Sequence, residues 1–346
     1  MTAFAPGVLP PEWAPQAAVL LTWPHAHSDW ADTLHTTETE FVGFAAAIAQ
    51  REPLIVACHD EDHRRHVADR LAHADAPPAR LTLAIAPSND VWVRDHGPLT
   101  VLRGRQRVAL DFGFNGWGDK YRAELDDAVT RTLADQDALG DIEIESLPWV
   151  LEGGNLEVDG EGTLLATRPC LMSETRNDPA AAQALLAALP TLLGVQRLLW
   201  VARGDVLGDD TDGHIDTLAR FCDAHTLAYT CADPADREQH AALDGLEEQL
   251  KALRQADGRP YQLVPLPVPA PLHDDDGRRL PANYANFLII NGAVLVPTYD
   301  DPHDALALDR LAGCFAGRTV VPVPARAIVG QNGSLHCASM QIPAAP

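Results

Sequence analysis

The sequence predicts an α/β protein in which five hairpin–helix–strand units close into a ring around a central axis. Short apolar runs and segments of helical periodicity alternate in one recurring order, and turn signals such as Asn291-Gly292 separate the paired strands. A single unit of about 50–70 residues cannot cover its own apolar faces, so neighbouring units have to pack against one another. Because no linker rich in proline, glycine or serine divides the chain, we expect 1–346 to form a single domain.

Four of the units follow one another along the chain. Their paired strands are expected at 91–102 and 107–112, 149–158 and 163–167, 214–221 and 226–231, and 283–290 and 293–299. Helices with one apolar face are expected around 125–129, 182–189, 243–253 and 308–315. The closing strands are expected at 142–147, 197–201, 261–266 and 319–323. Each unit therefore repeats the order strand, strand, helix, strand.

The fifth unit combines both ends of the chain. Its first two strands come from 334–341 and 18–23, and a helix with apolar residues at 41, 44 and 48 and the strand 54–58 follow. Residues 60–87 add a further helix and strand, and 267–281 form a long polar segment that we expect to be a surface loop or a lid. Both chain ends thus enter one unit, which closes the ring.

Three helices are expected to begin at Asp-Pro pairs, at 178–179, 233–234 and 301–302. Aspartate at the N-cap accepts a backbone hydrogen bond, and proline at the first helical position has its φ preset. The shared pair supports the repeat.

The overall charge argues against a nucleic-acid partner. Lys and Arg total 26 against 49 Asp and Glu, so the formal net charge of −23 repels phosphate backbones and attracts small cations toward an acidic cleft. An aid to solubility is the simpler interpretation of this acidity.

The sequence also lacks signals of a membrane or secreted protein. No apolar run approaches the roughly 18–20 residues that cross a bilayer, and the N-terminal segment has no basic patch followed by an apolar core. The six cysteines form no C-x-x-C pair, which fits a reducing compartment. We therefore expect a cytoplasmic protein that does not bind membranes.

A polar cluster lies on the expected first strand of every unit. If the units are related by rotation about one axis, these strands converge and bring the clusters into one cleft. The side chains expected in this cleft are Asp90, Asp95, Glu152, His214, Asp216, Asn286 and Cys337.

This set of residues suits a thiol nucleophile. Free cysteine is mostly protonated at neutral pH and needs a nearby cation to become reactive, and His214 is the candidate partner of Cys337. His336 is adjacent in sequence, but on a strand it would point to the opposite face and pack or hydrogen-bond behind the site. Each cluster alone has a simpler interpretation, such as a core thiol or a structural hydrogen bond between His214 and Asp216. Their recurrence in five units is the specific signal.

Several carboxylates in one cleft indicate a small cationic substrate. Two aspartates on either side of a planar slot match a guanidinium, whose N–H donors pair with carboxylates two at a time. Trp92 or Trp117 could stack on that plane or on an aliphatic tail, with core packing as the alternative for both.

These motifs resemble one protein family along almost the whole chain. The segments LPPEW, NDVWVRDHGP, FNGWGDK, LEGGN, DDTDGHID, YANF and SLHCASMQ are similar, in order, to those of agmatine deiminases and the related bacterial-type peptidylarginine deiminases. The resemblance implies a five-bladed α/β-propeller of ββαβ units around a pseudo-five-fold axis. It also implies a homodimer that needs no cofactor and no metal.

The resemblance implies roles for individual residues. Cys337 is expected to be the nucleophile, His214 the general acid and base, and Asp95 and Asp216 the guanidinium clamp, which Glu152 helps to position. The reaction implied is hydrolysis of agmatine to N-carbamoylputrescine and ammonia through a covalent thiouronium.

The sequence indicates less clearly which residues bind the part of the substrate beyond the guanidinium. The GQNG and ASMQ segments around Cys337 depart from the family's pattern, and so does the acidic DDTDGH. Asp210, or its neighbours Asp209 and Asp212, could receive a distal ammonium, or these acids could simply be exposed to solvent. Peptidylarginine or free arginine is the alternative substrate.

Two alternatives lie outside the family. A metallohydrolase could use His214 and Asp216, although H-x-D lacks the second histidine of familiar zinc spacings. An inactive guanidine-binding protein would keep the aspartates but would not need Cys337.

Overall fold

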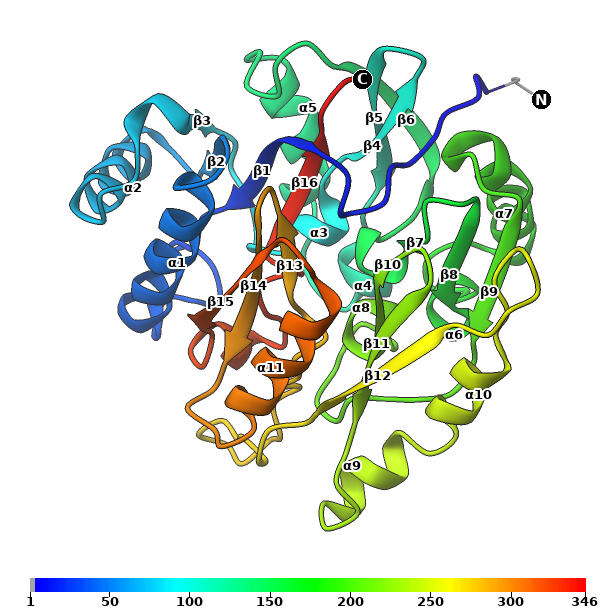
Figure 1. Cartoon of the computed structure of the whole chain (residues 1–346). Coiled ribbons are helices and arrows are strands. Elements are labelled where there is room, and N and C mark those ends of the chain that lie inside the picture. Colours follow the sequence, from blue (N-terminus) through cyan, green and yellow to red (C-terminus); the bar gives the residue numbers. More distant parts are fainter. Residues whose placement is uncertain (1–3) are drawn as a thin grey trace.

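The computed structural model describes residues 4–346, whose strands form five small sheets around a common centre (Figure 1). Four sheets have three strands and one has four. In every sheet the first two strands run antiparallel, and the next strand joins in parallel after a helical connection. The predicted ββαβ repeat and the five-bladed α/β-propeller are confirmed.

The four consecutive sheets differ mainly in strand length. Their strands are β4 (Leu99–Arg103), β5 (Gln106–Gly113) and β6 (Glu143–Val150); β7 (Glu157–Val158), β8 (Thr163–Thr167) and β9 (Arg197–Val201); β10 (Ala219–Asp223), β11 (Thr226–Cys231) and β12 (Gln262–Pro267); and β13 (Leu288–Ile290), β14 (Ala293–Thr298) and β15 (Thr319–Pro324). The helices of their connections are α4 (Gly116–Asp119), η2 (Asp126–Ala128), α5 (Val129–Ala134), α6 (Arg168–Leu171), α7 (Pro179–Leu193), α9 (Arg237–Ala242), α10 (Leu246–Ala252) and α11 (Asp304–Cys314). Within residues 4–346, no helix has the length and apolarity that crossing a membrane requires.

The fifth sheet joins the two ends of the chain, as predicted. β16 (Ser339–Pro343) pairs antiparallel with β1 (Gln16–Thr22), with Met340 opposite Leu20. β2 (Leu54–Cys58) follows α1 (Leu34–Ala49) and pairs in parallel with β1. The added elements are α2 (Glu61–His73), η1 (Pro78–Arg80) and β3 (Leu81–Ile85).

Only one of the three Asp-Pro pairs begins a helix. Asp178 caps α7 by accepting from the backbone N–H groups of Ala180 and Ala181, and Pro179 is the first helical residue. At 233–234 and 301–302 the prediction is wrong, because these pairs form turns and the helices begin later, at Arg237 and Asp304. The aspartates there accept from backbone groups two residues on, which stabilises a turn instead of a helix.

The polar clusters do not lie on the first strands, and this prediction is also wrong. They lie on short turns that come directly before those strands, which we call the axial turns. These are α3 (Val93–His96), η3 (Gly153–Asn155) and α8 (Ile215–Leu218), the last two together with their N-cap residues Glu152 and His214, and the segments 281–287 and 334–338. On a strand, neighbouring side chains point to opposite faces, whereas a turn can direct closely spaced side chains and backbone N–H groups toward one point.

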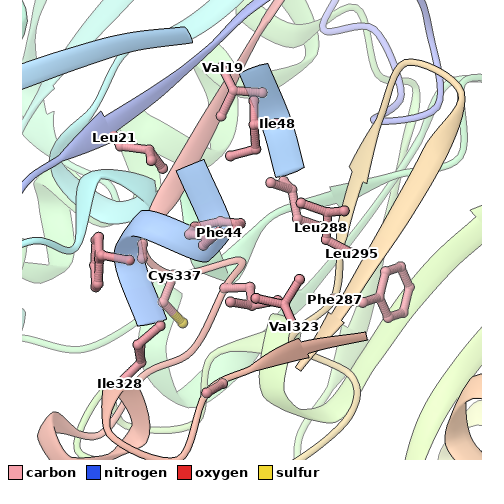
Figure 2. Close-up of a cluster of buried hydrophobic side chains, with 14 of the residues drawn as sticks. Val19, Leu21, Phe44, Ile48, Phe287, Leu288, Leu295, Val323, Ile328 and Cys337 are labelled. Atoms are coloured by element: carbon pink, nitrogen blue, oxygen red, sulfur yellow. The ribbon is translucent and has the colours of Figure 1, made fainter. Parts of the chain in front are cut away.

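The largest apolar cluster lies between α1 and the sheets of the fourth and fifth units. Phe41, Phe44 and Ile48 form the buried stripe of α1, at the spacing expected for one face of a helix. Burying each of these side chains is worth roughly 1.5–3 kcal/mol. Cys337 belongs to the same cluster (Figure 2), so the thiol is held against a close-packed core.

Candidate active site

The five axial turns contact one another in a closed circuit. The contacts are Gly154 N to Asp95 Oδ1 at 2.9 Å, Ile215 N to Asn155 Oδ1 at 3.3 Å, Asn286 Nδ2 to Asp216 Oδ2 at 3.3 Å, His336 N to Asn286 O at 3.2 Å, and Arg94 N to Cys337 O at 3.1 Å. Figure 1 shows α3 and α8 near the centre of the ring of sheets. Segments from all five units therefore build one site.

Cys337 lies in the axial turn 334–338, and its side chain is 6% exposed. Its Sγ lies 3.4 Å from Asp216 Oδ2 and accepts a hydrogen bond from Asn286 Nδ2 at 3.1 Å. Asn286 Oδ1 in turn accepts from the backbone N–H groups of His336 and Cys337, at 3.0 and 3.2 Å. Asn286 thus fixes both the turn and the direction of the thiol.

The surroundings keep this thiol uncharged. Burial raises the pKa of Cys337 well above its usual value, and the negative charges of Asp216 and Asp95 raise it further. A cation bound between the two carboxylates would cancel the repulsion from both. The geometry therefore ties the nucleophilic form of the thiol to the presence of a positively charged ligand.

His214 is fully buried between two carboxylates. Its Nε2 lies 2.7 Å from Glu152 Oε2, and its Nδ1 lies 3.5 Å from Asp95 Oδ1. Burial lowers the pKa of His214, but Asp95, Cys170 and Glu152 together raise it well above the ordinary value. The imidazole is therefore a cation that can release a proton from Nδ1.

Two buried polar atoms in the site have no hydrogen-bond partner within residues 4–346. They are His214 Nδ1, a donor when the ring is charged, and Asp216 Oδ1, an acceptor. Buried polar atoms are nearly always paired, so an unpartnered donor and acceptor in one cleft indicate a polar ligand.

Gly154 leaves the space in which these groups meet. A Cβ added there would lie 2.6 Å from His214 Nδ1, 2.7 Å from Asp95 Oδ1 and 3.2 Å from Asp216 Oδ2. The acid/base candidate and both clamp candidates therefore surround one point, and Asp216 also contacts the sulfur of Cys337.

Of the ten residues predicted for the site, six line one pocket and four lie buried beside it. The lining residues are Asp90, Trp92, Asp95, Trp117, Asp210 and Cys337, and the buried ones are Glu152, His214, Asp216 and Asn286. Asp29, Tyr121 and Asn332 also line the pocket. The neighbours Asp209 and Asp212 are not among its lining residues, and Asp212 pairs with Lys120 and Arg176.

The tryptophans hold the acids of this pocket in place. Trp117 Nε1 donates to Asp95 Oδ2 at 3.0 Å, and its backbone has a φ of 57°, in the left-handed region. Trp30, which was not predicted, donates to Asp90 Oδ1 at 2.7 Å. Burial raises the pKa values of both Asp90 and Asp95 to about 6.

A second layer of charges was not predicted from the sequence. His336 makes the hydrogen bonds expected of it, but strand alternation does not apply to this turn, because its Nδ1 lies 2.7 Å from Asp216 Oδ2, the oxygen that Cys337 Sγ also contacts. Its Nε2 lies 2.7 Å from Glu12 Oε1. Burial raises the pKa of Asp216, but His336 lowers it to below the usual value. Glu12 also pairs with Arg94 and Arg220, at 3.2 and 2.5 Å. The glutamate of the LPPEW motif was the signal that could have identified this layer.

Arg176 performs a similar role for Glu152. Its guanidinium contacts both carboxylate oxygens of Glu152, at 2.9 and 3.0 Å. Burial raises the pKa of Glu152, yet His214 and Arg176 lower it to below the usual value. No motif in the sequence pointed to Arg176.

Two clusters near the site have the residue types of a metal centre. They are Glu152 with Cys170 and His214, and Glu12 with Glu157 and His336. Each already holds an arginine, because Arg176 pairs with Glu152 and Arg220 with Glu157. A metal ion would have to displace these cations, so neither cluster suits one.

Comparison with known proteins gives matches along nearly the whole chain. The family model of Porphyromonas-type peptidyl-arginine deiminases matches residues 8–343. An agmatine deiminase of Stutzerimonas stutzeri is 32% identical over 97% of this chain and 95% of its own.

Solved structures show the same extent of similarity. An agmatine deiminase of C. jejuni with substrate bound is 32% identical, with a TM-score of 0.87 over 96% of this chain and 95% of its own. A Porphyromonas gingivalis protein, provisionally named an arginine deiminase, is 49% identical, with a TM-score of 0.88 over 97% of this chain and 98% of its own.

Proposed function

Since this chain belongs to the family of Porphyromonas-type peptidyl-arginine deiminases, we propose that it hydrolyses agmatine to N-carbamoylputrescine and ammonia. The reaction proceeds through a covalent thiouronium on Cys337 and uses the chain's own side chains without a metal or cofactor. The observation that carries the proposal is the arrangement around Gly154, where His214, Asp95 and Asp216 surround one point and Asp216 contacts Cys337 Sγ at 3.4 Å.

The charge of the pocket favours agmatine over free arginine. Its lining includes the acids Asp29, Asp90, Asp95 and Asp210, and no lysine or arginine of residues 4–346 lines it. The distal ammonium of agmatine is attracted by such a pocket, whereas the α-carboxylate of free arginine would face carboxylates without a compensating cation. A blocked arginyl peptide carries neither an ammonium nor an α-carboxylate at that position, so the acids of the pocket outside the guanidinium clamp do not strengthen its binding.

Substrate binding activates the nucleophile. The guanidinium donates hydrogen bonds to Asp95 and Asp216, and its charge lowers the pKa of Cys337, so the thiol releases its proton to solvent through the pocket that it lines. The thiolate adds to the central carbon and forms a tetrahedral intermediate. His214 gives a proton to one NH₂ group, the C–N bond breaks with its electron pair on nitrogen, and ammonia leaves. A thiouronium on Cys337 remains.

Hydrolysis follows on the same groups. The now neutral His214 takes a proton from water, and the oxygen adds to the thiouronium carbon. The C–S bond then breaks with its electron pair on sulfur while the added hydroxyl loses its remaining proton to solvent, which releases the ureido product and restores the thiolate. Glu152 and its partner Arg176 hold the imidazole in place through both steps.

The decisive experiment compares three substrates. Purified protein is incubated with agmatine, free arginine and a blocked arginyl peptide, and ammonia and ureido product are measured. We expect kcat/KM to be highest for agmatine. Turnover of the peptide alone would overturn the agmatine assignment.

Two controls separate this proposal from other classes. Activity should survive a chelator and fall by on the order of 10⁴-fold or more in Cys337→Ala. Loss of activity with the chelator and its retention in Cys337→Ala would point instead to a metallohydrolase. A haloacetamidine should form a covalent adduct at Cys337, and its absence would favour a guanidine-binding protein without catalysis.

We further propose that 1–346 acts as a single catalytic domain, because segments of all five units supply the site. The family resemblance supports a homodimer, which light scattering of the purified protein would test, and the absence of a C-x-x-C pair among the six cysteines fits a cytoplasmic location.

A further inference from the structure

A second cluster of functional side chains lies away from the catalytic pocket. Five histidines line one surface pocket where β1 and β2 end and α2 begins, and none of its lining residues belongs to the catalytic pocket. The histidines are His25, His27, His59, His63 and His66. β1 and β2 are parallel neighbours, so the segments that follow them meet at the same edge of the sheet.

Three of these histidines already have fixed partners. His25 uses both ring nitrogens, because Nε2 donates to Ser88 O at 3.1 Å and Nδ1 accepts from the backbone N–H of His27 at 3.2 Å. His63 Nδ1 accepts from the backbone N–H of His59 at 2.9 Å.

His66 is the third, with Nε2 2.7 Å from Glu38 Oε1. The hydrogen bonds of these three histidines fix the frame of the pocket, and among their buried ring nitrogens only His63 Nε2 lacks a partner within residues 4–346.

His27 and His59 remain unused. Within residues 4–346 no hydrogen bond involves either ring, and His59 Nδ1 is buried without a partner. The ring of His25 packs against that of His59, with centroids 4.3 Å apart, and so limits its rotation. Asp60 lies beside them. Its Oδ1 accepts from the backbone N–H of His63 at 2.8 Å, and its Oδ2 takes no part in this hydrogen bond.

The unused atoms have the spacing of ligands to one ion. One ligand atom each from His27, His59 and Asp60 lies within 4.8 Å of the other two. Since His27 and Asp60 are exposed, small rotations can bring all three to the roughly 2.0–2.2 Å of a zinc–nitrogen or zinc–oxygen bond. Imidazole with carboxylate suits zinc, nickel or copper better than the oxygen-seeking calcium or magnesium.

We propose that His27, His59 and Asp60 form a binding site for a divalent transition-metal ion of the zinc class, with water completing the coordination. His25 and His63 are positioning residues, because they orient the ligand-bearing segments. Asp62 and Glu38 also line the pocket, but each is paired with an arginine of α2, Arg65 and Arg70, so the charge available to a cation comes from Asp60.

The site connects to the wall of the catalytic pocket. The loop that carries His27 continues directly to Asp29, which lines the catalytic pocket, and to Trp30, which binds Asp90. An ion held by His27 on this loop and by His59 and Asp60 before α2 therefore fastens the loop to the body of the protein.

Calorimetric titration of the full chain with ZnCl₂, after treatment with a chelator, tests the proposal. We expect one ion per chain and an affinity at least about tenfold weaker in His27→Ala and in His59→Ala. Asp60→Asn keeps a good N-cap residue for α2 and removes the charged ligand, so it should also weaken binding. His225→Ala, an exposed histidine in the β10–β11 turn, is the matched control and should bind as the wild type does.

The thiols are a competing site for zinc, so the titration is repeated on Cys337→Ser, where binding should be unchanged. Melting temperatures without metal show whether each variant is folded. Absence of one-to-one binding, unchanged affinity in both histidine variants, or loss of binding in Cys337→Ser would overturn the proposal. Because ion binding is the readout, none of these outcomes bears on the deimination reaction.

Discussion

Gly154→Ala is the sharpest test of the catalytic geometry. The added methyl would lie 2.6 Å from His214 Nδ1 and 2.7 Å from Asp95 Oδ1, while ordinary contact begins at 3.4 Å. The two atoms would therefore have to withdraw by roughly 0.8 and 0.7 Å, and a misplacement of about 1 Å can reduce a rate by about 10²-fold. We expect kcat/KM for agmatine to fall by about that factor.

The effect on stability should be modest. Overpacking typically costs about 1–3 kcal/mol, so the variant should remain folded with a melting temperature lowered by several degrees. Gly43→Ala is the matched control, because a Cβ on this glycine of α1 meets no atom within 4 Å. That change should leave kcat/KM unaltered and stabilise the helix by up to about 1 kcal/mol.

The assay is ammonia release at several agmatine concentrations, with thermal unfolding of the same preparations. If Gly154→Ala keeps kcat/KM within about threefold of wild type, the three polar groups do not converge on this point during catalysis and the proposed clamp is wrong.

Three further predictions concern charge. Burial raises the pKa of Asp95 to about 6, so kcat/KM for agmatine should fall as the pH drops through 6 and the clamp becomes protonated; a flat profile between pH 5 and about 7.5 would contradict this. Burial raises the pKa of Glu12, but Arg220, His336 and Arg94 lower it well below the usual value, so its stabilising effect is present at neutral pH and lost only in strong acid. Glu12→Gln should therefore lower the free energy of unfolding at pH 7 by about 3 kcal/mol, a difference from wild type that denaturant titration should find to shrink below about pH 4. Asp210→Asn should raise KM for agmatine by about tenfold with little change in kcat if Asp210 receives the distal ammonium, and an unchanged KM would exclude that role.

The sequence predicted the architecture well because its signals are local and repeated. Apolar periodicity and hairpin turns such as Asn291-Gly292 determine each unit, and five copies leave few alternatives to a ring. The same repetition predicted that distant clusters meet, and Cys337, Asp216 and Asn286 do contact one another. That chemistry is consistent with the roles implied by the family, which remain predictions for each residue.

The failures have separate physical causes. The axial turns are too short for periodicity to reveal, so the pattern predicts strands where α3 and α8 lie. Asp233 and Asp301 make turn hydrogen bonds that compete with helix capping, and no local rule decides between the two. Glu12 contacts His336 across 324 residues, which only the folded chain reveals, and Arg176 contacts Glu152 from a connection of the same unit that carries no motif.

The pairing of β16 with β1 has a consequence for synthesis. A ribosome makes Cys337 after every other residue of the catalytic site. One edge of β1 also stays unpaired until residues 339–343 have been made and form β16. Nascent or prematurely ended chains thus carry an acidic cleft without a nucleophile and an unpaired β-edge, which is the kind of surface that chaperones and proteases detect. The chain therefore gains its nucleophile and covers its β-edge in the same step, when the segment with Cys337 and β16 is made.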